Sequence, residues 1–83
     1  MYNIIFTRKS EGQLDKLDNS IRERIISSLE RIRIRPENFV ERLVGEPGYK
    51  FRIGDYRLIL DINNDQLIIL VIEIGHRRNI YKK

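Results

Sequence analysis

The hydrophobic pattern of this chain changes its period once, near the middle. Between Ser20 and Ile32, isoleucines and leucines recur every three or four residues with arginines between them, which is typical of an amphipathic helix. From Tyr49 onward apolar and polar residues alternate, which is typical of strands with one buried face. The 83 residues suffice for one core and not for two. We therefore expect a single domain, residues 1–83, in which helices pack on a sheet.

The first half of the chain predicts one strand and two helices. Residues 4–6 form an opening strand, and Thr7 is placed to cap a short helix over roughly 8–17. Residues 20–23, Ser-Ile-Arg-Glu, have the pattern of a capping box at the start of the second helix. Pro36 should end that helix, because proline disfavours helical geometry at the residue before it.

The second half predicts three strands. Residues 49–53 and 56–62 flank Gly54-Asp55, a two-residue hairpin loop with glycine where a type II′ turn needs it, and residues 67–74 form the most buried strand. The order is β-α-α-β-β-β. We therefore expect an α+β fold, with a helical hairpin packed on one face of a largely antiparallel four-stranded sheet.

Strand parity gathers basic side chains on one sheet face. The two-residue loop sets Arg52 opposite Arg57, and Lys50, two residues earlier, shares their face. Like charges directly opposite each other destabilise a sheet by roughly a few tenths of a kcal/mol or more. The pair is therefore splayed into solvent, paired with Asp61, or held together for an anion.

The formal net charge of +4 is carried by the last eight residues, which hold four of the 16 basic residues and none of the 12 acids. Such a basic strip suggests an anionic partner, with nucleic acid the commonest. If the strip continues the last strand, either His76, or Arg77 with Glu73, comes alongside Arg57, and the sequence alone leaves both registers open. Tyr81 suits stacking on a base, or packing on the end of the sheet equally well.

Composition excludes several kinds of site. With no Cys and one His, the chain lacks a thiol nucleophile and the ligands of a Cys- or His-based metal site, so no metal or other cofactor is expected. The longest apolar run, residues 67–72, is far shorter than a membrane span, and the start lacks the basic region of a signal peptide. We expect a cytoplasmic protein.

Lysine, arginine and tyrosine without a metal or a thiol suit the chemistry of a phosphodiester. Guanidinium groups stabilise the extra negative charge of its transition state, and in RNA the adjacent 2′-OH is a built-in nucleophile. Lys50 is the candidate general base, because neighbouring arginines disfavour its protonated form and arginine itself does not give up a proton easily. His76 is either a general acid or base or a plain residue at the edge of the sheet.

Three segments in this order carry a family resemblance: residues 43–53 (Leu-Val-Gly-Glu-Pro-Gly-Tyr-Lys-Phe-Arg-Ile), residues 55–59 (Asp-Tyr-Arg-Leu-Ile) and residues 75–81 (Gly-His-Arg-Arg-Asn-Ile-Tyr). Together with the strand and helical hairpin before them, they resemble the RelE branch of the RelE/ParE toxin superfamily, from prokaryotic type II toxin–antitoxin systems. The resemblance implies a metal-independent endoribonuclease that cuts mRNA in the ribosomal A site. It also implies a small cognate antitoxin wrapped around the toxin, with operator DNA a further candidate partner through that antitoxin.

The resemblance also assigns roles to residues of this chain. Lys50 matches the base, Arg57 and Arg77 would stabilise the phosphorane, and Arg77 or His76 would assist the leaving group. The expected catalytic residues are Lys50, Arg57, Arg77, Tyr81 and His76, and the expected substrate-binding residues are Arg52 and Arg78. Arg77 rather than His76 falls at the site, which favours the register with Glu73 on the face of Arg57.

Two positions depart from the family pattern. Arg52 stands where lysine is common, and His76 stands where RelE proper often has lysine, so proton transfer is shared differently here. The alternatives are a ParE-like, non-catalytic toxin that inhibits DNA gyrase, and an inactive member that only binds its antitoxin. A gyrase binder has no need of the complete set of basic residues and Tyr81.

Overall fold

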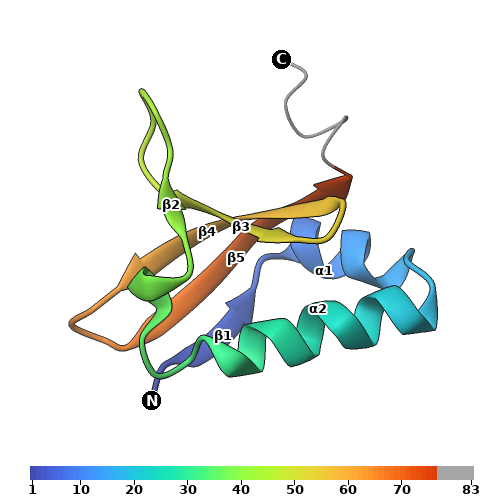
Figure 1. The fold of residues 1–83 in the computed structure, drawn as a ribbon, viewed down its shortest axis with the longest axis horizontal. Helices are drawn as coiled ribbons and strands as arrows, with labels where there is room; N and C mark the ends of the chain where they lie inside the picture. Colours follow the sequence, from blue (N-terminus) through green and yellow to red (C-terminus); the bar gives the residue numbers. More distant parts are fainter. Residues whose placement is uncertain (77–83) are drawn as a thin grey trace.

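The computed structural model describes residues 1–76, so Arg77, Arg78 and Tyr81 lie outside the described residues. Two helices lie along one side of a sheet, and the other side of the sheet carries no helix in this part of the chain (Figure 1). The elements are β1 (Asn3–Phe6), α1 (Arg8–Asp15), α2 (Asn19–Arg31), a 3-10 turn (Pro36–Asn38), β2 (Glu41–Arg42), β3 (Tyr49–Ile53), β4 (Tyr56–Asn63) and β5 (Ile68–His76). The predicted α+β class and helical hairpin are confirmed.

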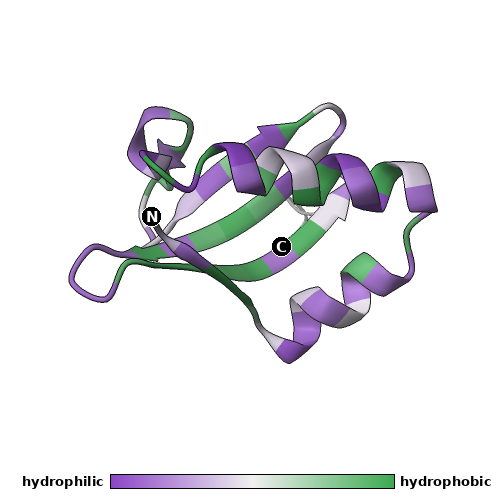
Figure 2. Ribbon diagram, turned by 90° about the horizontal axis from the view of Figure 1, so that it is seen from below, coloured by the Kyte–Doolittle hydropathy of each residue, from purple (hydrophilic) through white to green (hydrophobic). Residues whose placement is uncertain are grey.

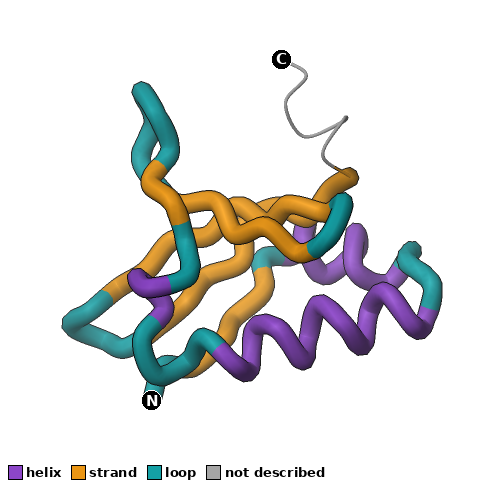
Figure 3. Tube along the Cα trace, viewed as in Figure 1, coloured by secondary structure: helices purple, strands orange, loops and turns teal. Residues whose placement is uncertain are grey.

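Within residues 1–76 the sheet has five strands, in the order β1-β5-β4-β3-β2 (Figure 3). β1 runs parallel to β5, and the other neighbours are antiparallel. The prediction of four strands missed β2, which is only two residues long and is held by its pairing with β3. Such a short strand has no alternating pattern that a sequence could reveal.

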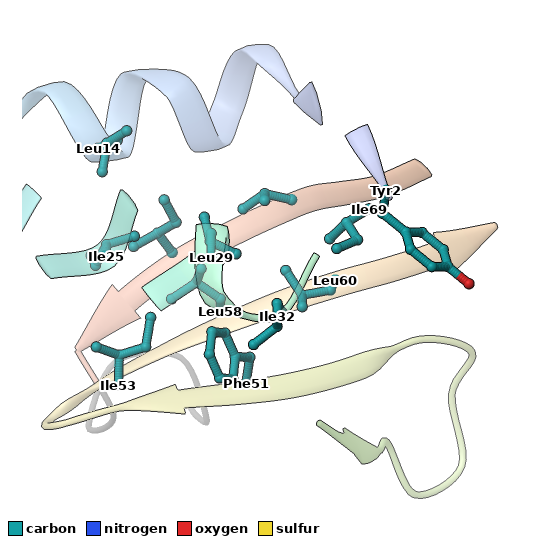
Figure 4. Packing of buried hydrophobic residues seen from close by; sticks show 12 residues of the cluster. Tyr2, Leu14, Ile25, Leu29, Ile32, Phe51, Ile53, Leu58, Leu60 and Ile69 are labelled. Carbon is teal, nitrogen blue, oxygen red and sulfur yellow. The ribbon is translucent and has the colours of Figure 1, made fainter. Parts of the chain in front are cut away.

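The core lies between the helices and the sheet. Viewed from the helix side, apolar stretches of the strands lie behind the helices (Figure 2). Figure 4 shows these side chains pointing toward one another from both layers. The buried apolar residues are Tyr2, Leu14, Ile25, Leu29, Ile32, Phe51, Ile53, Leu58, Leu60, Ile69, Val71 and Ile74. No helix within residues 1–76 has the length and apolar character needed to cross a membrane.

The start of α1 agrees with the sequence and the start of α2 does not. Thr7 caps α1, because its side-chain oxygen accepts a hydrogen bond from the backbone N–H of Ser10 at 3.1 Å. The predicted capping box is wrong: Ser20 lies inside α2, and the N-cap is Asp18, whose side chain makes no capping hydrogen bond. Arg22 secures this end of the helix instead, since its guanidinium donates to the carbonyl oxygen of Leu17 at 3.0 Å.

α2 also ends before the predicted point, at Arg31 rather than at Pro36. The chain leaves the helix to join the first strand: Tyr2 N–H donates to the carbonyl oxygen of Arg33 at 2.9 Å, and Arg33 Nε donates to the carbonyl oxygen of Tyr2 at 2.7 Å. Hydrogen bonds between distant segments therefore end the helix, and Pro36 begins the 3-10 turn.

The predicted register of the β3–β4 hairpin is confirmed. Ile53 pairs with Tyr56 and Arg52 with Arg57. Gly54 has a φ of +58°, as the first central position of a type II′ turn requires. Because side chains alternate along a strand, this register puts Arg52 and Arg57 on the open face of the sheet.

β5 contains a bulge, after which the alternation of core-facing and open-facing residues is shifted by one position. Leu60 pairs with Val71, but the neighbouring Ile59 pairs with Glu73, so Ile72 is an extra residue. As a result Val71 and Ile74 both face the core, and Glu73 turns to the open face.

Helix α1 and its N-cap residue support the bulge with three side chains. The hydroxyl of Ser10 donates to the carbonyl oxygen of Val71 at 2.7 Å, and the hydroxyl of Thr7 donates to the carbonyl oxygen of Ile72 at 3.2 Å. The side-chain oxygen of Gln13 accepts a hydrogen bond from Ile74 N–H at 2.7 Å. The backbone groups that a bulge would leave unsatisfied are thus bonded to α1.

Candidate functional site

Three cations meet on the open face of the sheet, and we call Lys50, Arg52 and Arg57 the basic cluster. Arg52 and Arg57 are directly opposite each other on β3 and β4, and Lys50 lies on the same face of β3. Arg52 is exposed, whereas Lys50 and Arg57 are half-buried and the Nε atom of Arg57 is fully buried. The cluster is thus partly built into the sheet surface, where its charges are less screened than on a fully exposed face.

The basic cluster lines a central hollow of about 170 Å³, together with Phe39 and Glu41. A larger side groove of about 740 Å³ lies beside it, between the β2–β3 connection and the surfaces of β4 and β5. Lys50 and Arg57 line both spaces, so an anion bound by the cluster would sit at the junction of the hollow and the groove.

Apolar side chains form much of the wall of the side groove. They come from the β2–β3 connection and from the open faces of β4 and β5, and they are Leu43, Val44, Pro47, Ile59 and Ile72. Ile72 reaches this wall because of the bulge in β5. The groove therefore combines an apolar wall with charged side chains of both signs: the cations are Arg42, Lys50 and Arg57, and the acids are Glu41, Glu46 and Glu73.

Glu41 belongs to the site, although no pattern in the sequence pointed to it. β2 pairs Glu41 with Lys50, and its carboxylate lies 3.4 Å from Lys50 Nζ. The Glu41 side chain is 76% exposed, so the pair is a solvated one and contributes little to stability. Its effect is local: the carboxylate offsets part of the positive charge of the cluster and holds the Lys50 amine at the hollow. Only the pairing of β2 with β3 places Glu41 beside Lys50, and a strand of two residues has no sequence pattern from which that pairing could be predicted.

The structure selects one of the two registers that the sequence left open. Glu73 faces the open side with Arg57, whose direct partner on β5 is Gly75, a residue without a side chain. His76 pairs with Tyr56 and packs edge-on against its ring, with the centroids 5.6 Å apart. Tyr56 shares its sheet face with the core residue Ile53, so His76 lies across the sheet from the basic cluster.

The expected site residues are therefore divided into three groups. Lys50, Arg52 and Arg57 are brought together, and His76 lies on the other face. Arg77, Arg78 and Tyr81 lie outside the described residues. In residues 1–76, no three His, Asp or Glu side chains are grouped so that they could hold a metal ion.

The arrangement can bind an oxyanion and move a proton beside it. Two guanidinium groups and one ammonium group converge on a hollow, which suits the non-bridging oxygens of a phosphate. Lys50 and Glu41 are the groups lining the hollow that can exchange a proton with a bound ligand.

Comparison with known proteins gives a family and a fold. The family described as "ParE toxin of type II toxin-antitoxin system, parDE" matches residues 4–81. A chain of the intact E. coli RelBE toxin–antitoxin complex is 25% identical, with a TM-score of 0.79 over 92% of this chain and 96% of that one. The isolated E. coli RelE toxin is also 25% identical, with a TM-score of 0.78 over 92% of this chain and 84% of that one.

A structure from another organism shows the same fold. A chain of the Mycobacterium tuberculosis RelBE2 toxin–antitoxin complex is 24% identical, with a TM-score of 0.83 over 92% of this chain and 98% of that one. No curated protein matches the chain in sequence.

Proposed function

Because this chain belongs to the ParE toxin family and is a RelE-like toxin of the RelE/ParE superfamily, we propose that it is a metal-independent, ribosome-dependent endoribonuclease that cuts mRNA and so inhibits translation. Membership alone leaves the activity open, since one fold serves several functions. The observation that carries the proposal is the convergence of Lys50, Arg52 and Arg57 on one hollow of the open sheet face. A toxin that acts only by binding another protein has no need of such a phosphate-sized basic hollow.

The proposed reaction uses the RNA as its own nucleophile. The 2′-OH attacks the adjacent 3′ phosphate, the bond to the 5′ oxygen breaks, and the products are a 2′,3′-cyclic (or 3′) phosphate and a 5′-OH. Lys50 must first lose its own proton, and its neutral amine then takes the proton from the 2′-OH, while Arg57 stabilises the negative charge that develops on the phosphorane oxygens. Arg52, the exposed member of the cluster, binds the backbone beside the reacting phosphate.

The remaining roles belong to the end of the chain. Arg77 is proposed to share the stabilisation of the phosphorane and to assist the leaving group, with His76 as the other candidate for that proton. The position of His76 across the sheet favours Arg77. Tyr81 is proposed to stack on or orient a base, and Arg78 to add to substrate binding.

The proposed partners follow from the same family. RelBE relatives are found as toxin–antitoxin complexes, so we propose that a cognate antitoxin neutralises this chain and links the complex to operator DNA. The substrate is mRNA in the ribosomal A site, which places the action in the cytoplasm.

Expression of the chain without an antitoxin tests the proposal, with transcript 5′ ends mapped in the same cells. We expect new 5′ ends inside translated coding regions. Arg57→Ala should reduce cleavage by about 100-fold or more, the usual effect of removing one transition-state donor. Lys50→Ala should have an effect of similar size, because it removes the proton acceptor. Lys16→Ala, an exposed change at the end of α1, is the control and should cut like the unaltered chain.

The alternative function is that of a ParE-like toxin that inhibits DNA gyrase. The observation in its favour is that the matching family is described as ParE toxin. That toxin would cause DNA damage without transcript cuts, and its effect would survive the Lys50→Ala and Arg57→Ala changes. An inactive member that only binds its antitoxin would produce neither result.

A further inference from the structure

A second basic surface lies where the edge of β3 meets helix α2. It is a hollow of about 280 Å³, which we call the edge notch. Its polar lining consists of Arg24, Ser27, Ser28, Arg31 and Arg52. The proposed reaction gives the α2 residues of this notch no role.

The helix supplies one wall of the edge notch. Arg24, Ser27 and Arg31 are three and four residues apart, so they lie on one face of α2. All three are exposed, and the buried Ser28 lies beside them. An arginine guanidinium can bind two phosphate oxygens at once, in a bidentate manner, and serine hydroxyls are common additional hydrogen-bond donors to RNA and DNA backbones.

The sheet supplies the other wall because β3 has a free edge there. β2 pairs only with Tyr49 and Lys50, which leaves the rest of β3 without a strand on that side within residues 1–76. The guanidinium of Arg24 lies against the hairpin turn: a Cβ on Gly54 would come within 3.1 Å of its two terminal nitrogens. A glycine at the turn therefore lets Arg24 reach across from the helix to the sheet.

The arginines of the edge notch lack acidic partners among the described residues. In that part of the chain, no ion pair involves Arg24, Arg31 or Arg52. Arg33, just beyond the same helix, is by contrast paired with Glu30 at 2.8 Å. Three arginines around one hollow without acidic partners repel one another, and a bound anion would relieve that repulsion.

We propose that the edge notch binds a backbone phosphate of RNA whose strand continues from the basic cluster across the free edge of β3. Arg52 and Phe39 line both the edge notch and the central hollow, so the two sites are contiguous. The proposal rests on the proposed function in one respect, that the ligand is RNA. The proposed source of the phosphate is the strand that is cut, and a folded RNA beside it is the alternative that the test distinguishes.

Binding of RNA that cannot be cut tests the notch separately from cleavage. The probes are a short and a long fluorescent single strand with a 2′-O-methyl group on every ribose, which removes the nucleophile. The variant is Arg24→Gln with Arg31→Gln. The control is Arg8→Gln with Lys16→Gln, which removes the same charge from exposed positions at the two ends of α1. Circular dichroism and thermal unfolding confirm that both variants are folded.

We expect the notch variant to bind the long strand roughly twofold to thirtyfold more weakly than the unaltered chain, the range for two exposed ion pairs. The slope of log affinity against log salt should fall by about 0.7 for each phosphate that the variant no longer neutralises. The short strand, which fills only the basic cluster, should bind all three proteins alike, and the control should match the unaltered chain with both probes.

A 2′-O-methyl hairpin distinguishes the two sources of phosphate. A loss of affinity for the long single strand but not for the hairpin would support the proposed continuous strand. A loss for the hairpin but not for the long single strand would assign the notch to folded RNA and overturn the proposed path of the cut strand. Equal binding of all probes by the notch variant and the control would overturn the proposal, as would an unaltered chain that binds none of them.

Cleavage is measured in parallel on translated transcripts. If transcripts are not cut but RNA binding still depends on the notch arginines, the proposed function would be overturned and the edge notch would remain an RNA site. Cuts in coding regions, together with RNA binding that does not depend on the notch arginines, would support the proposed function and overturn the edge notch as an RNA site.

Discussion

At the scale of single residues, the basic cluster is moderated by one acid. Glu41 lies 3.4 Å from Lys50 Nζ at the rim of the central hollow. A carboxylate beside a phosphate site repels the ligand, yet it also keeps the lysine side chain from turning away. The balance of these two effects decides what Glu41 does for binding.

Glu41→Gln keeps the shape of the side chain and removes its charge. We expect tighter binding of uncleavable RNA, by up to about tenfold at low salt, because the positive potential of the hollow rises. Fluorescence anisotropy over a range of salt concentrations checks this, with Glu11→Gln on α1 as a distant control. Weaker binding than that of the control would show that holding Lys50 in place matters more than the repulsion.

Two glycines make a matched pair for a second prediction. Gly54 has a φ of +58° and would place a Cβ within 3.1 Å of Arg24, whereas a Cβ on Gly12, inside α1, would meet nothing within 4 Å. Gly54→Ala should lower the free energy of unfolding by about 1–2 kcal/mol, because a side chain is strained at positive φ. Gly12→Ala should raise it by about 0.5–1 kcal/mol, because alanine favours helix. Urea unfolding measures both, and equal effects would contradict the assigned turn.

At the scale of elements, α1 acts as a brace for the bulge of β5. Ser10 is fully buried and bonded to the strand, and the Gln13 side chain accepts a hydrogen bond from Ile74 N–H at 2.7 Å. Since the bulge turns Glu73 toward the open face and Ile74 into the core, the brace also determines which residues of β5 face the basic cluster.

Gln13→Ala should therefore lower the free energy of unfolding by about 1–3 kcal/mol, the cost of leaving a buried backbone N–H without its acceptor. Hydrogen exchange at the Ile74 amide should become faster in the same variant. Gln66→Ala, in the exposed turn between β4 and β5, is the control and should change neither quantity appreciably. An unchanged exchange rate at Ile74 would mean that another group takes over from Gln13.

At the scale of the whole molecule, sequence reasoning worked where the determinants are local. The alternation of residues 49–53 and the Gly54-Asp55 loop sufficed to bring Arg52 opposite Arg57. It failed where distant segments decide. The bulge at Ile72 lies in an uninterrupted apolar run, which does not indicate which residues face the core. α2 ends early because Arg33 and Tyr2 are joined by hydrogen bonds.

The strand order has a consequence for synthesis of the protein. β5 lies between β1 and β4, so the last strand that the structure describes is also the one that joins the first strand to the rest of the sheet. β1 has no strand to pair with, and α1 no bulge to brace, until residues 68–76 have emerged from the ribosome. Folding that depends on such distant pairings is late and slow. The core is therefore completed only after residues 68–76 are available to pair, and a chain truncated before β5 would lack both its fold and its basic hollow.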